Sequence, residues 1–402
     1  MAFRLTPKLN LELYGLLMVI TPFLLLQNYL QDSMGMLSRL SFSMGENDYP
    51  VFLFIAILLG LASVFFLIKN FTLNRLYGLI LVCFLFWVGY NTSDYYYNHH
   101  FYDIQHNWHY FAYAIYTWLA WRYYLSKKYP VEKIILRTFL LALGISAADE
   151  LIQVFISNRV FDLSDVAKDL WGCMIGQVFI HFVIFNLENL SFKKFWRKGI
   201  KDWTKHGLYL LILEVLFAWV FLNVSSLISD AKYAVNVLFI TLLIFTILSF
   251  LLHLAGKKPM RYYVIALTAF LIIYPLVRLK FSEPKISITS GNIIIYKGLP
   301  VPYFDLMIYP NGMMRPVDKK TSFNVRDKKK IEAIGPDILI LATGKKGQGG
   351  KGFQDQLKVE MKYNFEKDKN YQIIKLPNRE ACKLYNKLVK EGKKILMIIH
   401  NS

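Results

Sequence analysis

Long apolar runs recur along the chain up to about residue 280, and each is close to the roughly 20 residues that a helix needs to cross the hydrocarbon core of a bilayer. Polar and charged residues gather in the connections between these runs. The pattern predicts nine membrane spans, at about residues 12–30, 51–69, 75–91, 107–126, 134–156, 165–187, 207–228, 233–255 and 262–279. We therefore expect a mainly α-helical protein built on a polytopic transmembrane bundle.

Basic residues fall on alternate connections between the runs. The clusters lie at Arg4 and Lys8, Lys69 and Arg75, Arg122 to Lys133, Lys193 to Lys201, and Lys257 to Arg261. Cytoplasmic loops carry the excess of Lys and Arg, so we expect these connections and the N-terminus on the cytoplasmic side of a bacterial plasma membrane. No small-residue cleavage pattern follows the first apolar run, which is therefore predicted to be a first span and not a removed signal peptide.

Beyond Pro284 the pattern changes to short β-rich runs separated by turn signals. A helical pattern at 379–391 lies between the last two runs, and strand–helix–strand order is typical of an α/β fold. We expect a soluble C-terminal α/β domain. The predicted regions are 1–74 (N-terminal transmembrane helices), 75–190 (transmembrane core), 191–282 (additional transmembrane helices) and 283–402 (soluble domain).

Composition supports a membrane protein. The chain is 55% hydrophobic and only 19% charged, with a mean hydropathy of +0.34, which excludes the ordinary soluble and disordered classes. A net charge of +19 raises the question of nucleic acid, but the soluble domain lacks the motifs of the common nucleic-acid modules. We expect membrane lipids as partners and no nucleic acid. The three cysteines show no CxxC spacing, so neither a disulfide framework nor a zinc site is predicted.

The stretch from Ser146 to Gln177 departs from the apolar pattern. It places polar and ionisable side chains between two apolar segments: Asp149, Glu150, Gln153, Arg159, Asp162, Asp165 and Asp169. A charge at membrane depth costs roughly 2.5–3.5 kcal/mol even on insertion scales, so a chain that keeps so many is expected to use them. The basic-residue pattern places this stretch at the outer face. Two interpretations stay open, a ligand site and a structural polar network that joins two helices.

Helical spacing divides these residues into two groups. Asp149 and Glu150 lie four and three residues before Gln153, which predicts one polar cluster near the end of a span. In the next span, Asp165, Asp169, Gly172 and Gly176 are spaced four, three and four, which makes one stripe. The two glycines predict close helix packing. Arg159, in the connection between the spans, is the expected counter-ion for buried carboxylates.

These residues resemble the signature of the VanZ-like membrane family, which reads approximately E-I-x-Q, a short outer loop, then D-x-x-D-V-x-x-N-x-x-G-x-x-x-G. The matching positions are Glu150, Gln153, Arg159, Asp162, Asp165, Gly172 and Gly176. Upstream, His109 to Tyr113 resembles the family's H-F-x-x-Y element. The likeness covers about residues 75–190. It implies a membrane protein of cell-envelope physiology, since the family's namesake is associated with low-level resistance to a glycopeptide.

Histidines before the fourth predicted span offer a metal site as an alternative. These residues, with one nearby acid, are His99, His100, Asp103, His106 and His109. Their spacing fits no standard zinc pattern, and an interfacial belt rich in His and Tyr is the favoured interpretation. No metal or other cofactor is expected.

The C-terminal domain resembles the small Mth-type α/β family, which includes an adipogenesis-associated protein and a respiratory complex I assembly factor. The matching residues include Thr343, Gly344, Cys382, Tyr385, Asn386, Glu391 and Gly392. The resemblance implies a binding or assembly module that takes a protein partner. The family's soluble members work inside cells or mitochondria, whereas nine spans place this domain outside; we follow the span count. A glycine-rich loop at 345–352 is predicted to be a flexible loop in preference to an anion cradle.

The leading hypothesis is a non-catalytic membrane protein of the VanZ-like type that binds an envelope lipid or a glycopeptide-like group at the outer acidic residues. Tyr113 and His109 are further candidate contacts for this ligand. An alternative is a membrane-embedded enzyme that uses the carboxylates as general acid and base, with or without a metal. A third is an assembly scaffold that recruits a partner through the C-terminal domain.

Overall fold

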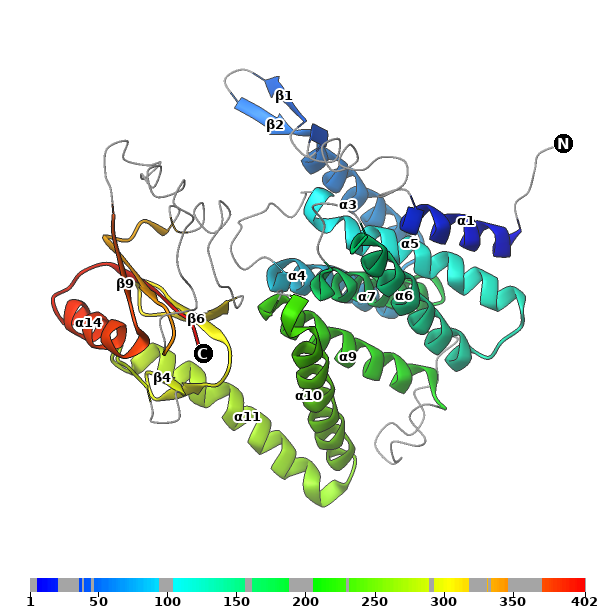
Figure 1. Cartoon of the computed structure of the whole chain (residues 1–402). Coiled ribbons are helices and arrows are strands. Elements are labelled where there is room, and N and C mark those ends of the chain that lie inside the picture. The colour runs from blue at the N-terminus through cyan, green and yellow to red at the C-terminus, as the bar shows by residue number, and fades with distance from the viewer. Residues whose placement is uncertain are drawn as a thin grey trace. The chain divides into compact units, whose positions relative to one another are not determined.

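The computed structural model describes residues 6–20, 36–37, 40–44, 47–93, 104–155, 161–187, 205–228, 231–288, 293–317, 331, 334–345 and 371–401. The chain divides into two units. The first comprises residues 1–93, 99–225 and 234–257 and is helical. The second comprises 94–98, 226–233 and 258–402 and holds one long helix and the strand-rich region. Figure 1 shows their elements.

The helical unit contains a short hairpin and eight α-helices in its described residues. The hairpin pairs β1 (Ser41–Met44) with β2 (Asn47–Pro50). The helices are α1 (Pro7–Ile20), α3 (Val51–Lys69), α4 (Leu73–Ser93), α5 (Ile104–Ser126), α6 (Val131–Gln153), α7 (Leu163–Val178), α9 (Gly207–Leu227) and α10 (Ala234–Ala255). A π-helical turn, η2 (Phe179–Ile184), continues α7. The long helix of the second unit is α11 (Lys258–Phe281).

Six described helices are long and apolar enough to cross a membrane, so the predicted nine spans are not confirmed. They lie at Val51–Lys69, Leu73–Ser93, Leu163–Ile184, Gly207–Leu227, Ala231–Ala255 and Pro259–Phe281. Helices also form where spans were predicted at 107–126 and 134–156, but α5 and α6 carry too many polar and charged residues to belong to the six. The described part of the first predicted span, α1, is only 14 residues long.

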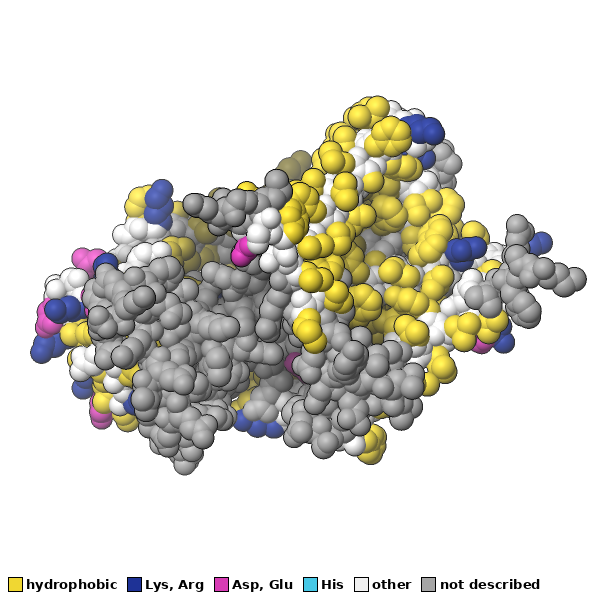
Figure 2. Space-filling model, turned by 90° about the horizontal axis from the view of Figure 1, so that it is seen from above, with side chains coloured by type: hydrophobic (Ala, Val, Ile, Leu, Met, Phe, Trp, Pro, Cys, Tyr) yellow, Lys and Arg dark blue, Asp and Glu magenta, His cyan; other side chains and the backbone are white. Residues whose placement is uncertain are grey.

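Helix α7 lies at the centre of the helical unit. It packs against α4, α5 and α6, as Figure 1 shows, and nearly all of its residues are buried. By contrast, α3 has no buried residue, and large apolar side chains such as Leu58 and Phe65 face outward. A broad apolar surface of this kind covers the helical unit in Figure 2. Outward apolar faces suit contact with lipid, whereas the ionisable residues of α7 are buried or partly buried inside the unit, away from such faces.

The described residues of the strand-rich region in the second unit form two sheets. A three-stranded meander runs β3 (Ile286–Ile288), β4 (Ile294–Tyr296) and β5 (Leu299–Val301). A five-stranded sheet has the order β7-β6-β10-β8-β9, with β7 at Met314–Val317, β6 at Asp305–Ile308, β10 at Ile395–Ile399, β8 at Ile338–Ala342 and β9 at Gln372–Leu376. Strands β8, β9 and β10 are parallel, whereas β6 is antiparallel to both of its neighbours.

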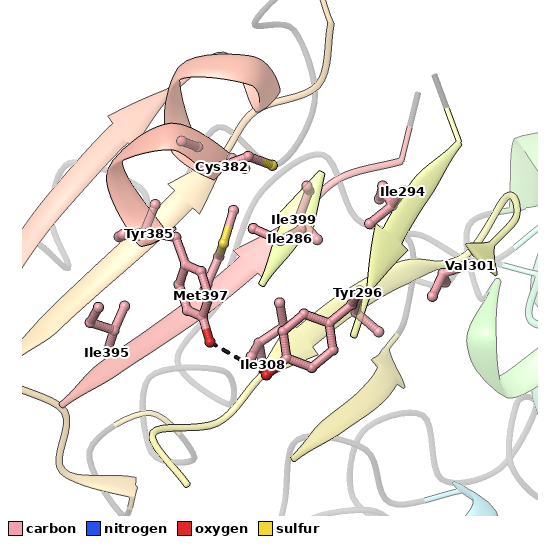
Figure 3. Packing of buried hydrophobic residues seen from close by; sticks show 14 of the residues in the cluster. Ile286, Ile294, Tyr296, Val301, Ile308, Cys382, Tyr385, Ile395, Met397 and Ile399 are labelled. Atoms are coloured by element: carbon pink, nitrogen blue, oxygen red, sulfur yellow. Dashed lines mark hydrogen bonds between the residues drawn. The ribbon is translucent and has the colours of Figure 1, made fainter. Parts of the chain in front are cut away.

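Side chains bury both faces of the five-stranded sheet. Every residue of β8 and of β10 is buried, as expected of interior parallel strands. On one face, helix α14 (Asn378–Lys390) covers a cluster that includes Tyr296 and Tyr385 (Figure 3). The hydroxyl groups of these two tyrosines lie 3.5 Å apart. The predicted order of strand, helix and strand is therefore present as β9, α14 and β10.

Helix α11 is joined to the meander by hydrogen bonds at its C-terminal end. Lys297 and Gly298, both with positive φ, form the two-residue turn between β4 and β5. The Lys297 ammonium donates to the Leu279 carbonyl at 2.6 Å, and Arg278 Nε donates to the Lys297 carbonyl at 3.0 Å. Since the last carbonyls of a helix lack partners within it, this lysine caps α11.

We expect Lys297→Met to loosen the junction between α11 and the meander. The variant keeps the apolar stem and removes a charged hydrogen bond worth about 1.5–3 kcal/mol. Limited proteolysis of the full chain should cleave near residue 283 several-fold faster than in the wild type. Lys383→Met, an exposed lysine of α14, is the control and should change nothing. Equal cleavage rates for the two variants would contradict the capping role.

Candidate functional site

The beginning of α7 is fixed by two carboxyl groups. Asp162 precedes the helix in extended conformation, and its Oδ1 accepts a hydrogen bond from the Ser164 amide at 2.7 Å, as expected of an N-cap residue. Glu150 of α6, only 2% exposed, accepts from the Asp162 amide at 2.9 Å and from Gln153 Nε2 at 2.6 Å. Glu150 thus ties the end of α6 to the start of α7.

Asp169 joins three helices through its two carboxylate oxygens. It lies on α7 and is 3% exposed. Its Oδ1 lies 2.8 Å from Nδ1 of His109 on α5, and its Oδ2 accepts from the Ser146 hydroxyl of α6 at 2.6 Å. Tyr113, one turn beyond His109, lies beside Ser146 and Asp169. These partners satisfy both oxygens of a carboxylate that is buried between α5, α6 and α7.

The counter-ion in the described residues is Lys168. Its ammonium lies 2.7 Å from Oδ1 of Asp165, three residues earlier on α7, and His109 Nε2 lies 3.9 Å from the same oxygen. The sequence interpretation named Arg159, which lies outside the described residues. The spacing of Asp165 and Lys168, an i,i+3 pair on a helix, is the signal that would have identified this lysine.

We use the name acidic cluster for Asp149, Glu150, Asp162, Asp165 and Asp169. In the described part of the chain these carboxyl groups outnumber the cations beside them, Lys168 and His109. Asp149 is the member least satisfied by the protein, because its Oδ1 is buried and has no hydrogen-bond partner among the described residues. A buried acceptor without a donor costs free energy, although the Asp149 carboxyl group also interacts with the Gln153 side chain.

Gly172 and Gly176 lie where α7 crosses α5. A Cβ added at Gly172 would lie 2.8 Å from the His109 carbonyl oxygen, and one at Gly176 would lie 2.9 Å from Cα of Ala114. Only glycine permits this approach, which brings His109 against Asp169. A glycine on α4, Gly89, also permits a close contact, because a Cβ added there would lie 2.6 Å from Cδ1 of Trp171. The sequence analysis did not identify this residue.

The histidine group considered as a metal site is only partly described. His99, His100 and Asp103 lie outside the described residues, as does the side chain of His106. His109 is engaged by carboxylates. Among the residues that the structure describes, no group of three or more His, Cys, Asp or Glu side chains is arranged to hold a metal ion.

The candidate residues near β8 hold strand ends of the C-terminal sheet in place. Gly344, with φ of 86°, donates its amide to Asn378 Oδ1 at 2.8 Å, and the Thr343 hydroxyl donates to the Leu376 carbonyl at 3.1 Å. Sequence reasoning missed the neighbouring contact between His400 Nδ1 and Asp305 Oδ2, at 2.8 Å. Most of the glycine-rich loop, 346–352, lies outside the described residues.

The candidate residues on and after α14 have structural contacts. Cys382 and Tyr385 lie in the core, and burial raises the pKa of the Cys382 thiol to about 12, so it is not a ready nucleophile. Asn386 pairs with both backbone groups of Ile286, at 2.9 and 2.7 Å. Glu391 follows α14, and Gly392, with φ of 74°, provides the left-handed residue that ends a helix.

Comparison with known proteins identifies part of the chain. Residues 48–186 match the family model described as VanZ/LLP1, so the matched segment begins earlier than the predicted 75–190 and includes α3. No curated protein shows significant similarity to the chain. A solved structure named "MT938" is 16% identical, with a TM-score of 0.23, and the alignment covers 30% of this chain and 99% of that one. At that TM-score the likeness does not test the predicted Mth-type domain. This chain is thus a membrane protein whose residues 48–186 form a VanZ-like segment.

Proposed function

We propose that the VanZ-like segment binds, without catalysis, an envelope lipid or a glycopeptide-like group at the acidic cluster. The observation that carries the proposal is the buried Oδ1 of Asp149, which has no partner among the described residues. A ligand group rich in donors, such as an ammonium or hydroxyl of a head group, would supply the missing hydrogen bond. Gln153, one turn from Asp149, would help to position it.

We also propose a membrane and an orientation for the chain. The VanZ-like segment supports placing the protein in a bacterial plasma membrane, and the alternating basic connections support a cytoplasmic N-terminus and an outward acidic cluster. An outer-face site meets lipid head groups and cell-wall precursors, both of which carry such donors. The C-terminal unit would act as an accessory module that binds a protein partner, and the predicted span count favours the outer side for it.

We expect Asp149→Asn to weaken binding of an ammonium-bearing lipid by about 10- to 100-fold, the loss of one charged hydrogen bond. The full chain purified in detergent would be titrated with phosphatidylethanolamine and, separately, with phosphatidylglycerol, and bound lipid counted by native mass spectrometry. The wild type should prefer the first lipid, and the variant should lose that preference while it keeps its melting temperature.

Two further variants sharpen this test. Glu12→Gln removes an exposed acid of α1 and should bind as the wild type does. Glu150→Gln alters the group that holds the start of α7 and is expected to lower stability, so a loss of binding in this variant alone would not support the site. Unchanged lipid preference in Asp149→Asn would refute the proposal.

An enzyme is the second candidate, and the pairing of His109 with Asp169 favours it, because a carboxylate that orients an imidazole is a general-base arrangement. Against it, the nearby Ser146 hydroxyl donates to Asp169 and is not hydrogen-bonded to His109. Stoichiometric metal in the purified protein that is lost in Asp165→Asn would promote this candidate. A scaffold would instead be supported by a partner that co-purifies with the full chain and is lost when residues 283–402 are removed.

A further inference from the structure

Polar side chains on α7 continue beyond the acidic cluster toward the interior of the helical unit. Asp165, Asp169, Cys173 and Gln177 follow one another at intervals of four, so they lie along one side of the helix. Cys173 and Gln177 are both buried, and Gln177 is only 2% exposed. The polar side of α7 therefore runs from the helix start to a position deep in the helical unit.

Helix α5 presents a similar row of polar side chains to α7. His109, Tyr113 and Thr117 are also spaced by four residues. The first two lie beside Asp169, and Thr117 lies beside the Cys173 thiol, which in turn contacts Gln177. The Thr117 hydroxyl donates to the Tyr113 backbone carbonyl at 2.7 Å, which links the two halves of this row. We use the name polar file for the path His109, Asp169, Tyr113, Thr117, Cys173, Gln177 and Glu214.

The inner end of the polar file is Glu214. This acid lies in α9, whose other residues are nearly all apolar, and it is 5% exposed. Gln177 Nε2 donates to Glu214 Oε2 at 3.1 Å and approaches the Ile135 carbonyl of α6 at 3.3 Å. The remaining oxygens, Glu214 Oε1 and Gln177 Oε1, are buried and have no hydrogen-bond partner among the described residues.

No cation among the described residues offsets a charge on Glu214. Cys173 is the titratable group that faces it from α7, and no titratable side chain of α6 or α10 interacts with it in the described part of the chain. An isolated carboxylate in an apolar interior is very costly, and such a group takes up a proton instead. With a proton, the Glu214 carboxyl becomes a donor, and Gln177 Oε1 is the adjacent acceptor that lacks one.

We propose that Glu214 and Gln177 form a proton-binding site inside the helical unit, joined to the acidic cluster by the polar file. The proton binds to a carboxylate oxygen of Glu214 and leaves from the same group, so only an O–H bond forms or breaks. The hydroxyl and thiol groups of Tyr113, Thr117 and Cys173 provide the polar route by which protons exchange with the outer end. The site does not depend on what the acidic cluster binds.

Infrared spectroscopy of the full chain in detergent tests the site directly. At neutral pH the wild type should show the carbonyl stretch of a protonated carboxylic acid that shifts in D2O, and Glu214→Gln should lose that component. The amide of Glu214→Gln can still donate to Gln177, so this variant should remain folded. Gln177→Leu removes the acceptor and should move the band to the frequency of a carboxyl group with no hydrogen bond. Glu12→Gln, the exposed control on α1, should keep the wild-type band.

Exchange kinetics test the link to the acidic cluster. Thr117→Val keeps the shape of the side chain and removes its hydroxyl, so the Glu214 band should shift in D2O at least several-fold more slowly than in the wild type. Thr268→Val, an exposed position on α11, is the matched control and should exchange at the wild-type rate. A wild-type spectrum in which Glu214→Gln removes no protonated component would overturn the proton site. Equal exchange rates for the two threonine variants would overturn the polar route.

Discussion

Asp169→Ala is expected to lower the melting temperature of the full chain by about 10 °C, from a loss of about 3–5 kcal/mol. The carboxylate of Asp169 accepts from Ser146 at 2.6 Å and contacts His109 at 2.8 Å, so its removal leaves the buried Ser146 hydroxyl and the partly buried His109 ring without this partner. The change in tryptophan fluorescence would report unfolding, since Trp171, one of the eight tryptophans, lies on the same helix and is buried.

Two comparisons control this prediction. Glu12→Ala removes an exposed acid that lies 3.5 Å from Lys8 and should cost less than about 1 kcal/mol. Ser146→Ala removes one donor and should cost about 1–3 kcal/mol, because the buried Asp169 oxygen loses its partner. A melting temperature for Asp169→Ala that matches Glu12→Ala would show that this network does not hold the three helices together.

Gly172→Ala is expected to destabilise the helical unit by about 1–3 kcal/mol, the usual range for overpacking. The new methyl group would lie 2.8–2.9 Å from backbone atoms of His109 and Tyr110, which cannot rotate away as a side chain can. Helix α5 would have to move off α7, so the contact between His109 and Asp169 should lengthen. Thermal unfolding and the yield of folded protein both measure this effect.

Gly144→Ala is the matched control for this substitution. Gly144 lies in α6, and a Cβ added there meets no atom within 4 Å. The same change should therefore be neutral or stabilising by up to about 1 kcal/mol, since alanine favours a helix over glycine. If both variants lose stability equally, the loss at Gly172 does not come from the crossing of α5 and α7.

The positions of the helices were largely predictable from the sequence. Which of these helices are apolar enough to cross a membrane was less predictable. Apolar runs at 51–69 and 207–228 appear as α3 and α9 with almost the predicted bounds. The sequence interpretation also treated the polar segments at 107–126 and 134–156 as spans. These form helices that face α7, and their polar residues have partners inside the unit, which a count of hydrophobic residues does not reveal.

Sequence reasoning identified all five residues of the acidic cluster but not their hydrogen-bond and ion-pair partners. Asp165 and Asp169 were placed on one stripe by their spacing, and the structure separates their partners, Lys168 for the first and His109 with Ser146 for the second. Glu214 was missed entirely. It stands alone in an apolar run, and its partner Gln177 is 37 residues away, so no local pattern connects the two.

The sequence by itself determined the apolar runs, the change to a strand-rich region after Pro284, and the acidic residues with their helical spacing. These are local properties, set by hydrophobicity and by the 3.6-residue period of a helix. The tertiary structure alone decided that α7 is the central helix, that His109 reaches Asp169, and that Gln177 meets Glu214. Such contacts join segments far apart in the chain, and the one between His109 and Asp169 also depends on how closely Gly172 and Gly176 let α5 and α7 approach.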